Sequence, residues 1–235
     1  MEIGMIKSVF LDLDDTVLDF RHAEREAIST ALESLGIEPI EALLTRYSEI
    51  NLECWKLLER GEITREEVKT RRFSILFSEL SYNGSPEQTQ KIYERALGTS
   101  HKFVDGAEEM LEILSKKYDL YIASNGMLNV QIPRIKGADI AKYFKDIFIS
   151  EQIGKNKPSL EFFEACFSKI EGFQKDNCII VGDSPSSDIL GGKRAGILTC
   201  LYNPLGKICK SPSPDYEIKA LSELPLLLEK INFGE

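Results

Sequence analysis

The sequence lacks the features that would place it in a membrane or outside the cell. No run of about 18 apolar residues occurs, so we expect no transmembrane helix. Residues 1–7 lack the basic region and apolar run of a secretory signal peptide. The five cysteines form no Cys-x-x-Cys pair, are odd in number and lie mostly in apolar runs, which favours reduced thiols in the core. These absences predict a cytoplasmic protein with no membrane partner.

Positive charge is also scarce. The 29 Lys and Arg residues face 38 Asp and Glu residues, which gives a net charge of −9. This balance disfavours binding to the polyanionic backbone of nucleic acid, so we expect no polymeric nucleic acid partner. A small anionic substrate stays open, because a site can be locally positive. A length of 235 residues suits one large α/β domain, or a core with a small insert.

Hydrophobic periodicity divides the chain into a helical block and an alternating block. Residues 19–97 contain four helical segments, of which two begin at recognisable caps, Thr64 with Glu67 and Ser85 before Pro86. From about residue 105 helices alternate with strands. The expected strands there are 120–124, 146–150, 178–182 and 197–202, with a short extended segment at 216–218. Strand–helix alternation predicts a doubly wound parallel sheet, interrupted after its first strand by the helical block.

The first predicted strand leads into two carboxylates. An apolar run from Ser8 is followed by Asp12, Asp14 and Thr16. Strand side chains alternate, so both carboxylates should leave the strand end on the same side. Buried carboxylates cost solvation free energy, and a hard divalent cation such as Mg²⁺ is the usual compensation. An Asp can also act as a covalent nucleophile through an aspartyl-phosphate. The alternative is an acidic turn that closes a hydrophobic strand.

Three further polar groups follow the ends of other predicted strands. They are Ser124 with Asn125, Lys157 before a proline, and Asp183 with Asp188 five residues on. Each has a structural alternative: an ordinary turn, a solvated lysine, or a carboxylate facing a helix dipole. In open α/β sheets ligands bind at the carboxyl ends of the strands, so we expect these groups to converge. Carboxylates that hold a cation, together with a lysine, suit phosphoryl transfer.

These four groups resemble, in order, the motifs of the haloacid dehalogenase (HAD) superfamily, whose first motif is Asp-x-Asp-x-Thr. The resemblance covers nearly the whole chain and implies a HAD phosphatase. It implies a Rossmann-like core formed by residues 1–18 and 98–235, with strand order 5-4-1-2-3. It also implies that residues 19–97 form a helical cap of the C1 type, which closes over the site and selects the substrate.

The resemblance also implies roles for the acidic residues. Asp12 would be the nucleophile, and Asp14 would be the general acid and base that protonates the leaving oxygen and later activates water. Asp12, the main-chain carbonyl of Asp14, and Asp183 would bind Mg²⁺. Asp188 would support this metal shell or orient the lysine.

Phosphate binding is implied for Thr16, Ser124, Asn125 and Lys157. Lys155 is also close in sequence, but Lys157 is the one that precedes proline, as the family motif does.

Within the superfamily the likeness is closest to the pyrimidine 5′-nucleotidases. It rests on cap segments 51–55, 61–64 and 72–73 and on core segments 124–126, 149–151 and 188–192. Trp55 and Arg72 are the cap candidates for selecting the substrate, with packing inside the cap as the alternative. The favoured function is a magnesium-dependent phosphomonoesterase that acts on a small phosphorylated metabolite, most specifically a pyrimidine nucleoside monophosphate.

Three other functions stay open on this scaffold. A phosphosugar phosphatase or mutase would share every core residue, so only the cap or an assay separates it. A haloacid dehalogenase would keep Asp12 but would not be expected to carry the Asp14 acid or the Asp183 ligand. An inactive binding protein would be expected to have lost Asp12 or Asp14, and both are present.

Overall fold

A six-stranded parallel sheet forms the centre of the protein in the computed structural model, which describes residues 5–209 and 211–234. The strand order is β3-β2-β1-β4-β5-β6. Read from β5 to β3, this is the predicted order 5-4-1-2-3, with β6 added at the edge beside β5. The strands are β1 (Ser8–Leu11), β2 (Asp119–Ser124), β3 (Phe144–Ile149), β4 (Cys178–Gly182), β5 (Leu198–Tyr202) and β6 (Tyr216–Ile218).

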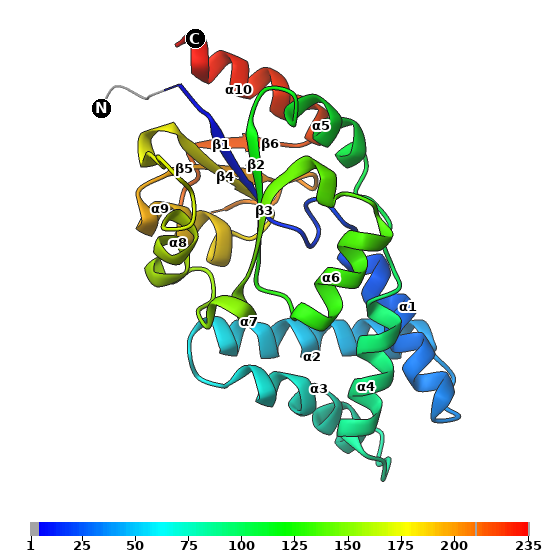
Figure 1. The fold of residues 1–235 in the computed structure, drawn as a ribbon. Helices are drawn as coiled ribbons and strands as arrows, with labels where there is room; N and C mark the ends of the chain where they lie inside the picture. The colour runs from blue at the N-terminus through cyan, green and yellow to red at the C-terminus, as the bar shows by residue number, and fades with distance from the viewer. Residues whose placement is uncertain (1–4, 210, 235) are drawn as a thin grey trace.

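Helices cover both faces of this sheet (Figure 1). On one face α5 (Ala107–Leu114) and α10 (Leu224–Phe233) pack in an apolar cluster with β1, β2 and β4. On the other face α8 (Leu160–Phe167) and α9 (Leu190–Ala195) contribute to a second cluster. Strand β1 is buried along its whole length, because it lies between β2 and β4 and is covered on both faces. Its carboxyl end is therefore held between the ends of β2 and β4.

Four helices between β1 and β2 form a separate group, at the bottom of Figure 1. They are α1 (Phe20–Ser34), α2 (Glu41–Glu59), α3 (Arg65–Glu79) and α4 (Pro86–Leu97). They have an apolar cluster of their own, which also includes Met127 and Val130 at the start of α6 (Leu128–Gly137). The predicted caps are present: Thr64 and Glu67 form a reciprocal capping box, and Ser85 caps α4 before Pro86.

Two linkers join the helical group to the sheet. They run antiparallel, with a bridge between Leu18 and Phe103. The amide of Asp19 donates to the carbonyl of Lys102 at 2.8 Å, and the amide of Val104 donates to the carbonyl of Val17 at 3.0 Å. The two chain connections between the helical group and the sheet therefore lie side by side in one narrow strip.

The structure differs from the sequence prediction at two strand–helix junctions. Ser150, predicted as the last residue of a strand, begins the short helix α7 (Ser150–Ile153). The predicted helix 187–195 begins earlier, with a π-helical turn over Pro185–Ile189 that leads into α9. This turn places Asp188 close to the end of β4, where its carboxylate accepts from the Ser184 amide at 3.1 Å. Within the described residues no helix combines the length and the apolar character needed to cross a membrane.

Candidate active site

The site is built at the carboxyl ends of β1, β2 and β4. In the sheet register Leu11 pairs with Ile122 on one side and Val181 on the other. The Asp12 amide donates to the Val181 carbonyl at 2.9 Å, so the pairing extends one residue beyond β1. This register places Asp12 next to Asp183, because each follows the end of its strand directly. The sheet alone therefore brings together two carboxylates that are 171 residues apart in sequence (183 − 12).

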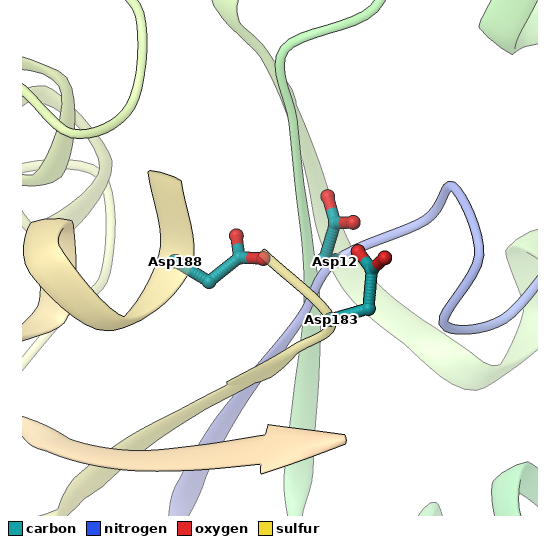
Figure 2. Close-up of side chains that lie close together, drawn as sticks. All are labelled: Asp12, Asp183 and Asp188. Atoms are coloured by element: carbon teal, nitrogen blue, oxygen red, sulfur yellow. The ribbon is translucent and has the colours of Figure 1, made fainter. Parts of the chain in front are cut away.

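Three carboxylates form the centre of the site. Asp12, Asp183 and Asp188 each offer an oxygen, and these oxygens all lie within 4.8 Å of one another. Figure 2 shows Asp12 at the end of β1, Asp183 at the end of β4, and Asp188 reaching towards them from the helical turn that follows. The structure thus brings the first motif, at Asp12, together with the last, at Asp183 and Asp188, as predicted. The side-chain cluster also contains Asp188, which was predicted to support the metal shell or orient the lysine, whereas Asp14 was predicted to take part through its main-chain carbonyl.

Lys157 lies inside this cluster. Its Nζ is 2.7 Å from Asp12 Oδ1 and 2.7 Å from Asp188 Oδ1, and it also donates to the Ala123 carbonyl. Burial acts to lower the pKa of Lys157, but the charges of Asp12 and Asp188 outweigh it and raise the pKa, so the ammonium stays charged. A solvated lysine, the alternative from sequence, is wrong, because only 1% of Lys157 is exposed.

The cluster carries excess negative charge. One ammonium faces three carboxylates, which leaves two charges uncompensated when all are ionised. Burial, with the neighbouring carboxylates, raises the pKa of Asp12 well above its ordinary value in spite of Lys157. Burial and the Asp188 charge raise the pKa of Asp183 to about 8. Hard carboxylate oxygens at this spacing and with this charge fit a divalent cation such as Mg²⁺. Asp12, Asp183 and Asp188 are the side chains that would hold it.

Asp14 lines the same cavity as Asp12 but has different partners. Gln131 Nε2 donates to Asp14 Oδ2 at 2.6 Å, and Arg134 forms an ion pair with Asp14 Oδ1. Both partners lie on α6, one helical turn apart, and Arg134 is buried. Sequence reasoning missed both residues. Their spacing, three residues apart on the helix that follows Ser124, was the available signal.

The predicted phosphate-binding residues separate into two kinds. Asn125 and Lys157 line the cavity and bind each other reciprocally: the Asn125 amide donates to the Lys157 carbonyl at 2.9 Å, and the Lys157 main-chain amide donates to Asn125 Oδ1 at 2.8 Å. Ser124 and Thr16 are buried and do not line it. Ser124 Oγ accepts from Gly126 and Gln131, whereas Thr16 Oγ1 has no partner among the described residues.

The helical group forms the other wall of a cavity of about 700 Å³. Its apolar lining includes Phe20, Leu52 and Trp55. Arg72 also lines the cavity, but its guanidinium is engaged inside the helical group. It donates to Asn51 Oδ1 at 2.6 Å and to Gln90 Oε1 at 2.8 Å and 3.2 Å, and it stacks on a tyrosine ring.

A buried carboxylate completes this network. Glu24 accepts from Asn51 Nδ2 at 2.6 Å and from Ser48, and all three line the cavity. Burial raises the pKa of Glu24, although both hydrogen bonds act to lower it. Sequence reasoning missed Glu24 and Ser48 and gave Asn51 only as part of segment 51–55, because these residues belong to helices that read as ordinary amphipathic ones.

Comparison with known proteins agrees with this geometry. Residues 9–202 match the model of the haloacid dehalogenase-like hydrolase family. The HAD-hydrolase YfnB of Bacillus subtilis is 36% identical over 93% of each chain, and its magnesium-bound crystal structure superposes with a TM-score of 0.91, covering 96% of this chain and 99% of YfnB. The pyrimidine 5′-nucleotidase PynA of Streptococcus pneumoniae is 35% identical over 97% of this chain and 99% of PynA. The N-acylneuraminate-9-phosphatase of Mus musculus is 25% identical over 99% of this chain and 97% of the relative.

These findings confirm the resemblance drawn from the sequence motifs, together with the prediction of a hydrolase of the phosphatase class. A parallel sheet with the predicted strand order ends in the motif residues of that family. The family model spans most of the chain, from β1 to β5. The chain belongs to the haloacid dehalogenase-like hydrolase family.

Proposed function

We propose that the protein is a magnesium-dependent phosphomonoesterase that works through an aspartyl-phosphate and acts on pyrimidine nucleoside 5′-monophosphates. One observation carries the chemistry. The Asp12 carboxylate lies at the floor of a large cavity, next to a charged lysine and two further carboxylates. A nucleophile, a fixed cation and a place for a metal are the parts that phosphoryl transfer needs.

In the first half-reaction a carboxylate oxygen of Asp12 attacks phosphorus. The bond between phosphorus and the leaving oxygen breaks as the new bond forms, and protonated Asp14 gives its proton to the leaving alcohol. Lys157 orients the nucleophile through Asp12 Oδ1 and faces the phosphoryl oxygens with its charge. Asn125 supports Lys157 through the two hydrogen bonds that join them.

In the second half-reaction water attacks the aspartyl-phosphate. Asp14, now a carboxylate, takes a proton from that water as it attacks phosphorus, and the Asp12 carboxylate leaves with inorganic phosphate as the other product. Gln131 and Arg134 hold the Asp14 carboxylate at the edge of the cavity. This arrangement keeps Asp14 within the site while Asp12 is bound covalently.

Magnesium would be held by Asp12, Asp183 and Asp188, with the Asp14 carbonyl as the fourth protein oxygen. When bound, it supplies positive charge that neutralises the phosphoryl group in the transition state. The donor set supports this assignment, because these oxygens carry more negative charge than Lys157 balances.

We further propose that residues 19–97 act as a cap and that residues 1–18 and 98–235 are the catalytic core. A separate apolar cluster and the narrow linker strip support this division. The core groups bind phosphate and metal, so the cap must recognise the rest of the substrate. Trp55 offers an aromatic wall for a base, and the amide and carboxylate groups around Asn51 and Glu24 offer a polar edge. Likeness to PynA favours a pyrimidine base over a purine.

A phosphosugar phosphatase is the second candidate. It is favoured by the likeness to N-acylneuraminate-9-phosphatase, which extends over nearly the full length of both chains. Polar groups in the cap wall would suit sugar hydroxyls as well as a base edge. The core chemistry would be unchanged.

A side-by-side substrate panel with and without Mg²⁺ tests the proposal. We expect hydrolysis of uridine and deoxyuridine monophosphates to have the highest kcat/KM and to stop in excess chelator. Acid-quenched enzyme should carry one phosphoryl group on a peptide containing Asp12. A higher kcat/KM for sugar phosphates would reject the nucleotidase assignment and leave the mechanism intact. Full activity in chelator would reject the metal requirement.

A further inference from the structure

Arg65 connects the helical group to the sheet domain beside the cavity. It is the first residue of α3, directly after the Thr64 cap. One of its terminal nitrogens donates to the carbonyls of Asn125 at 2.9 Å and Gly126 at 3.0 Å. The other donates to Ser150 Oγ at 2.6 Å and to Asn156 Oδ1. These contacts span 60 to 91 residues of sequence, all between residues 19–97 and the sheet domain.

Three of these four acceptors are at or directly beside the proposed phosphate-binding residues Asn125 and Lys157. Asn125 and Gly126 follow β2, Ser150 follows β3, and Asn156 precedes Lys157 in sequence. Arg65 therefore holds the two segments that are joined by the hydrogen bonds between the Asn125 side chain and the Lys157 main chain. A guanidinium suits this task, because its planar fork fixes several acceptors at once whereas an ammonium acts as a point charge.

Arg65 has neutral oxygen acceptors and lies outside the cavity. Burial lowers its pKa, and its four hydrogen-bonded acceptors are carbonyl, amide and hydroxyl oxygens. Arg65 does not line the cavity. Its neighbour Trp55 does, and the centre of the Trp55 ring is 6.0 Å from the guanidinium carbon of Arg65. The residue is thus placed to act through its neighbours rather than on a substrate.

The location of Arg65 suits a residue that holds the helical group against the sheet domain. Figure 1 shows the turn between α2 and α3 beneath α7, on the opposite side of the view from α1 and α4, where the linkers join. A second contact lies at the same turn: Glu59 Oε2 accepts from Ser186 Oγ at 2.9 Å. The helical group is therefore joined to the sheet domain by the linkers on one side of this view and by side-chain hydrogen bonds on the other.

We propose that Arg65 is a positioning residue that fastens the cap to the core and, by the same contacts, sets the geometry in which Asn125 and Lys157 meet the phosphoryl group. The inference rests on the proposed function, since it takes Asn125 and Lys157 as the phosphate-binding pair. It makes cap closure and assembly of the phosphate site one event. A substrate too small to touch the cap should therefore still depend on Arg65.

The test compares Arg65→Ala and Arg65→Lys with Arg71→Ala, an exposed arginine on the same helix. We expect Arg65→Ala to lower kcat/KM on the order of 10²-fold for p-nitrophenyl phosphate and for uridine monophosphate alike, because small displacements of positioning groups cost that much. Arg65→Lys should fall in between, and Arg71→Ala should match the unmodified enzyme. Equal values for all variants, or a loss confined to the nucleotide, would overturn the proposal.

Trp55 supplies a readout independent of turnover, because it is the single tryptophan of the chain. In Arg65→Ala the Trp55 emission should lie at longer wavelength than in the unmodified enzyme, and acrylamide should quench it more strongly. Adding inorganic phosphate with Mg²⁺ should not restore the emission and quenching of the unmodified enzyme. If Arg65 only stabilised the fold, melting temperature would fall while Trp55 quenching and kcat/KM of the folded protein stayed unchanged, which would also overturn the proposal. Failure of the nucleotidase assignment would appear in the unmodified enzyme, as normal p-nitrophenyl phosphate hydrolysis without nucleotide hydrolysis.

Discussion

Two buried cations, Lys157 in the sheet domain and Arg72 in the helical group, face the same cavity from opposite walls. Lys157 is paired directly with two carboxylates, Asp12 and Asp188. Arg72 is bonded to neutral amide oxygens, and the nearest carboxylate in its network, Glu24, is reached through Asn51. The cluster around Lys157 has more negative than positive charge, whereas the network around Arg72 pairs one guanidinium with one carboxylate through Asn51.

Under the proposed function, we expect this difference to separate the residues that carry out the reaction from those that select the substrate. Carboxylates held close together in a buried site can bind a metal ion, and one of them can attack phosphorus. A balanced network instead presents a fixed polar surface, which suits recognition of a substrate. Substitutions at the sheet wall should therefore change rate or metal binding, and substitutions at the helical wall should change which substrate is preferred.

The largest effect is expected for Asp12→Asn. An amide keeps the shape of the carboxylate but cannot form the aspartyl-phosphate, so kcat should fall on the order of 10³-fold or more. The melting temperature of the metal-free variant should stay level or rise, because one charge leaves a cluster with too many carboxylates. Steady-state assays and thermal unfolding check both statements. Near-normal turnover by the purified variant would reject Asp12 as the nucleophile.

The next largest effect is expected for Lys157→Met, on stability. Removing one partner from a buried charge cluster leaves carboxylates unpaired, so we expect the free energy of unfolding to fall by about 3–5 kcal/mol. The loss should grow with pH, because burial raises the pKa of Asp12 even beside Lys157, and without the lysine this carboxyl escapes the cost only while it is protonated. Urea unfolding in chelator measures it, with the exposed Lys155→Met as the matched control. Similar stabilities for the two variants would contradict the charge argument.

Magnesium should stabilise the protein more as pH rises. The pKa of Asp183 is raised by burial from 3.8 to about 8, so the metal-free fold keeps a proton that the unfolded chain has lost. Stability of the metal-free protein therefore falls as pH rises from the ordinary pKa towards 8. Because magnesium replaces that proton, its upward shift of the melting temperature should be larger at about pH 8.5 than at about pH 6, by on the order of several degrees. A shift that shrinks with pH would contradict this.

Local patterns in the sequence predicted the sheet wall well. Strands that end in Asp12, Asp183 and Ser124 are read from hydrophobic runs, and a parallel sheet brings their ends together. The partners of Asp14 could not be read in this way, because Gln131 and Arg134 approach it only once α6 packs against the site. Thr16 and Ser124 are buried and do not line the cavity, and the phosphate-binding role that the resemblance implied for them stays a prediction.

The helical wall was harder to predict, because nothing local distinguishes a packing residue from a lining one. Trp55 and Arg72 both line the cavity, yet the guanidinium of Arg72 is committed to Asn51 and Gln90. Helix periodicity predicts which face is buried, but it cannot say whether that face meets another helix or an open cavity. Arg65 illustrates the limit, since its acceptors lie 60 or more residues away in the sheet domain.

The smallest effect is expected for Trp55→Ala, and it separates selection from chemistry most sharply. The indole is partly buried at the cavity wall, and stacking of a base on an aromatic ring is worth about 1–3 kcal/mol. We therefore expect KM for uridine monophosphate to rise about 5- to 100-fold with kcat nearly unchanged, which is the kinetic mark of lost uniform binding. Hydrolysis of p-nitrophenyl phosphate should change far less, because that substrate has little to place against the cap. Trp55→Phe is the matched control, since it keeps an aromatic face and should recover most of the nucleotide affinity. Equal losses on both substrates would mean that Trp55 supports the closed cap rather than the base, and the division between a chemical wall and a selecting wall would then fail at this residue.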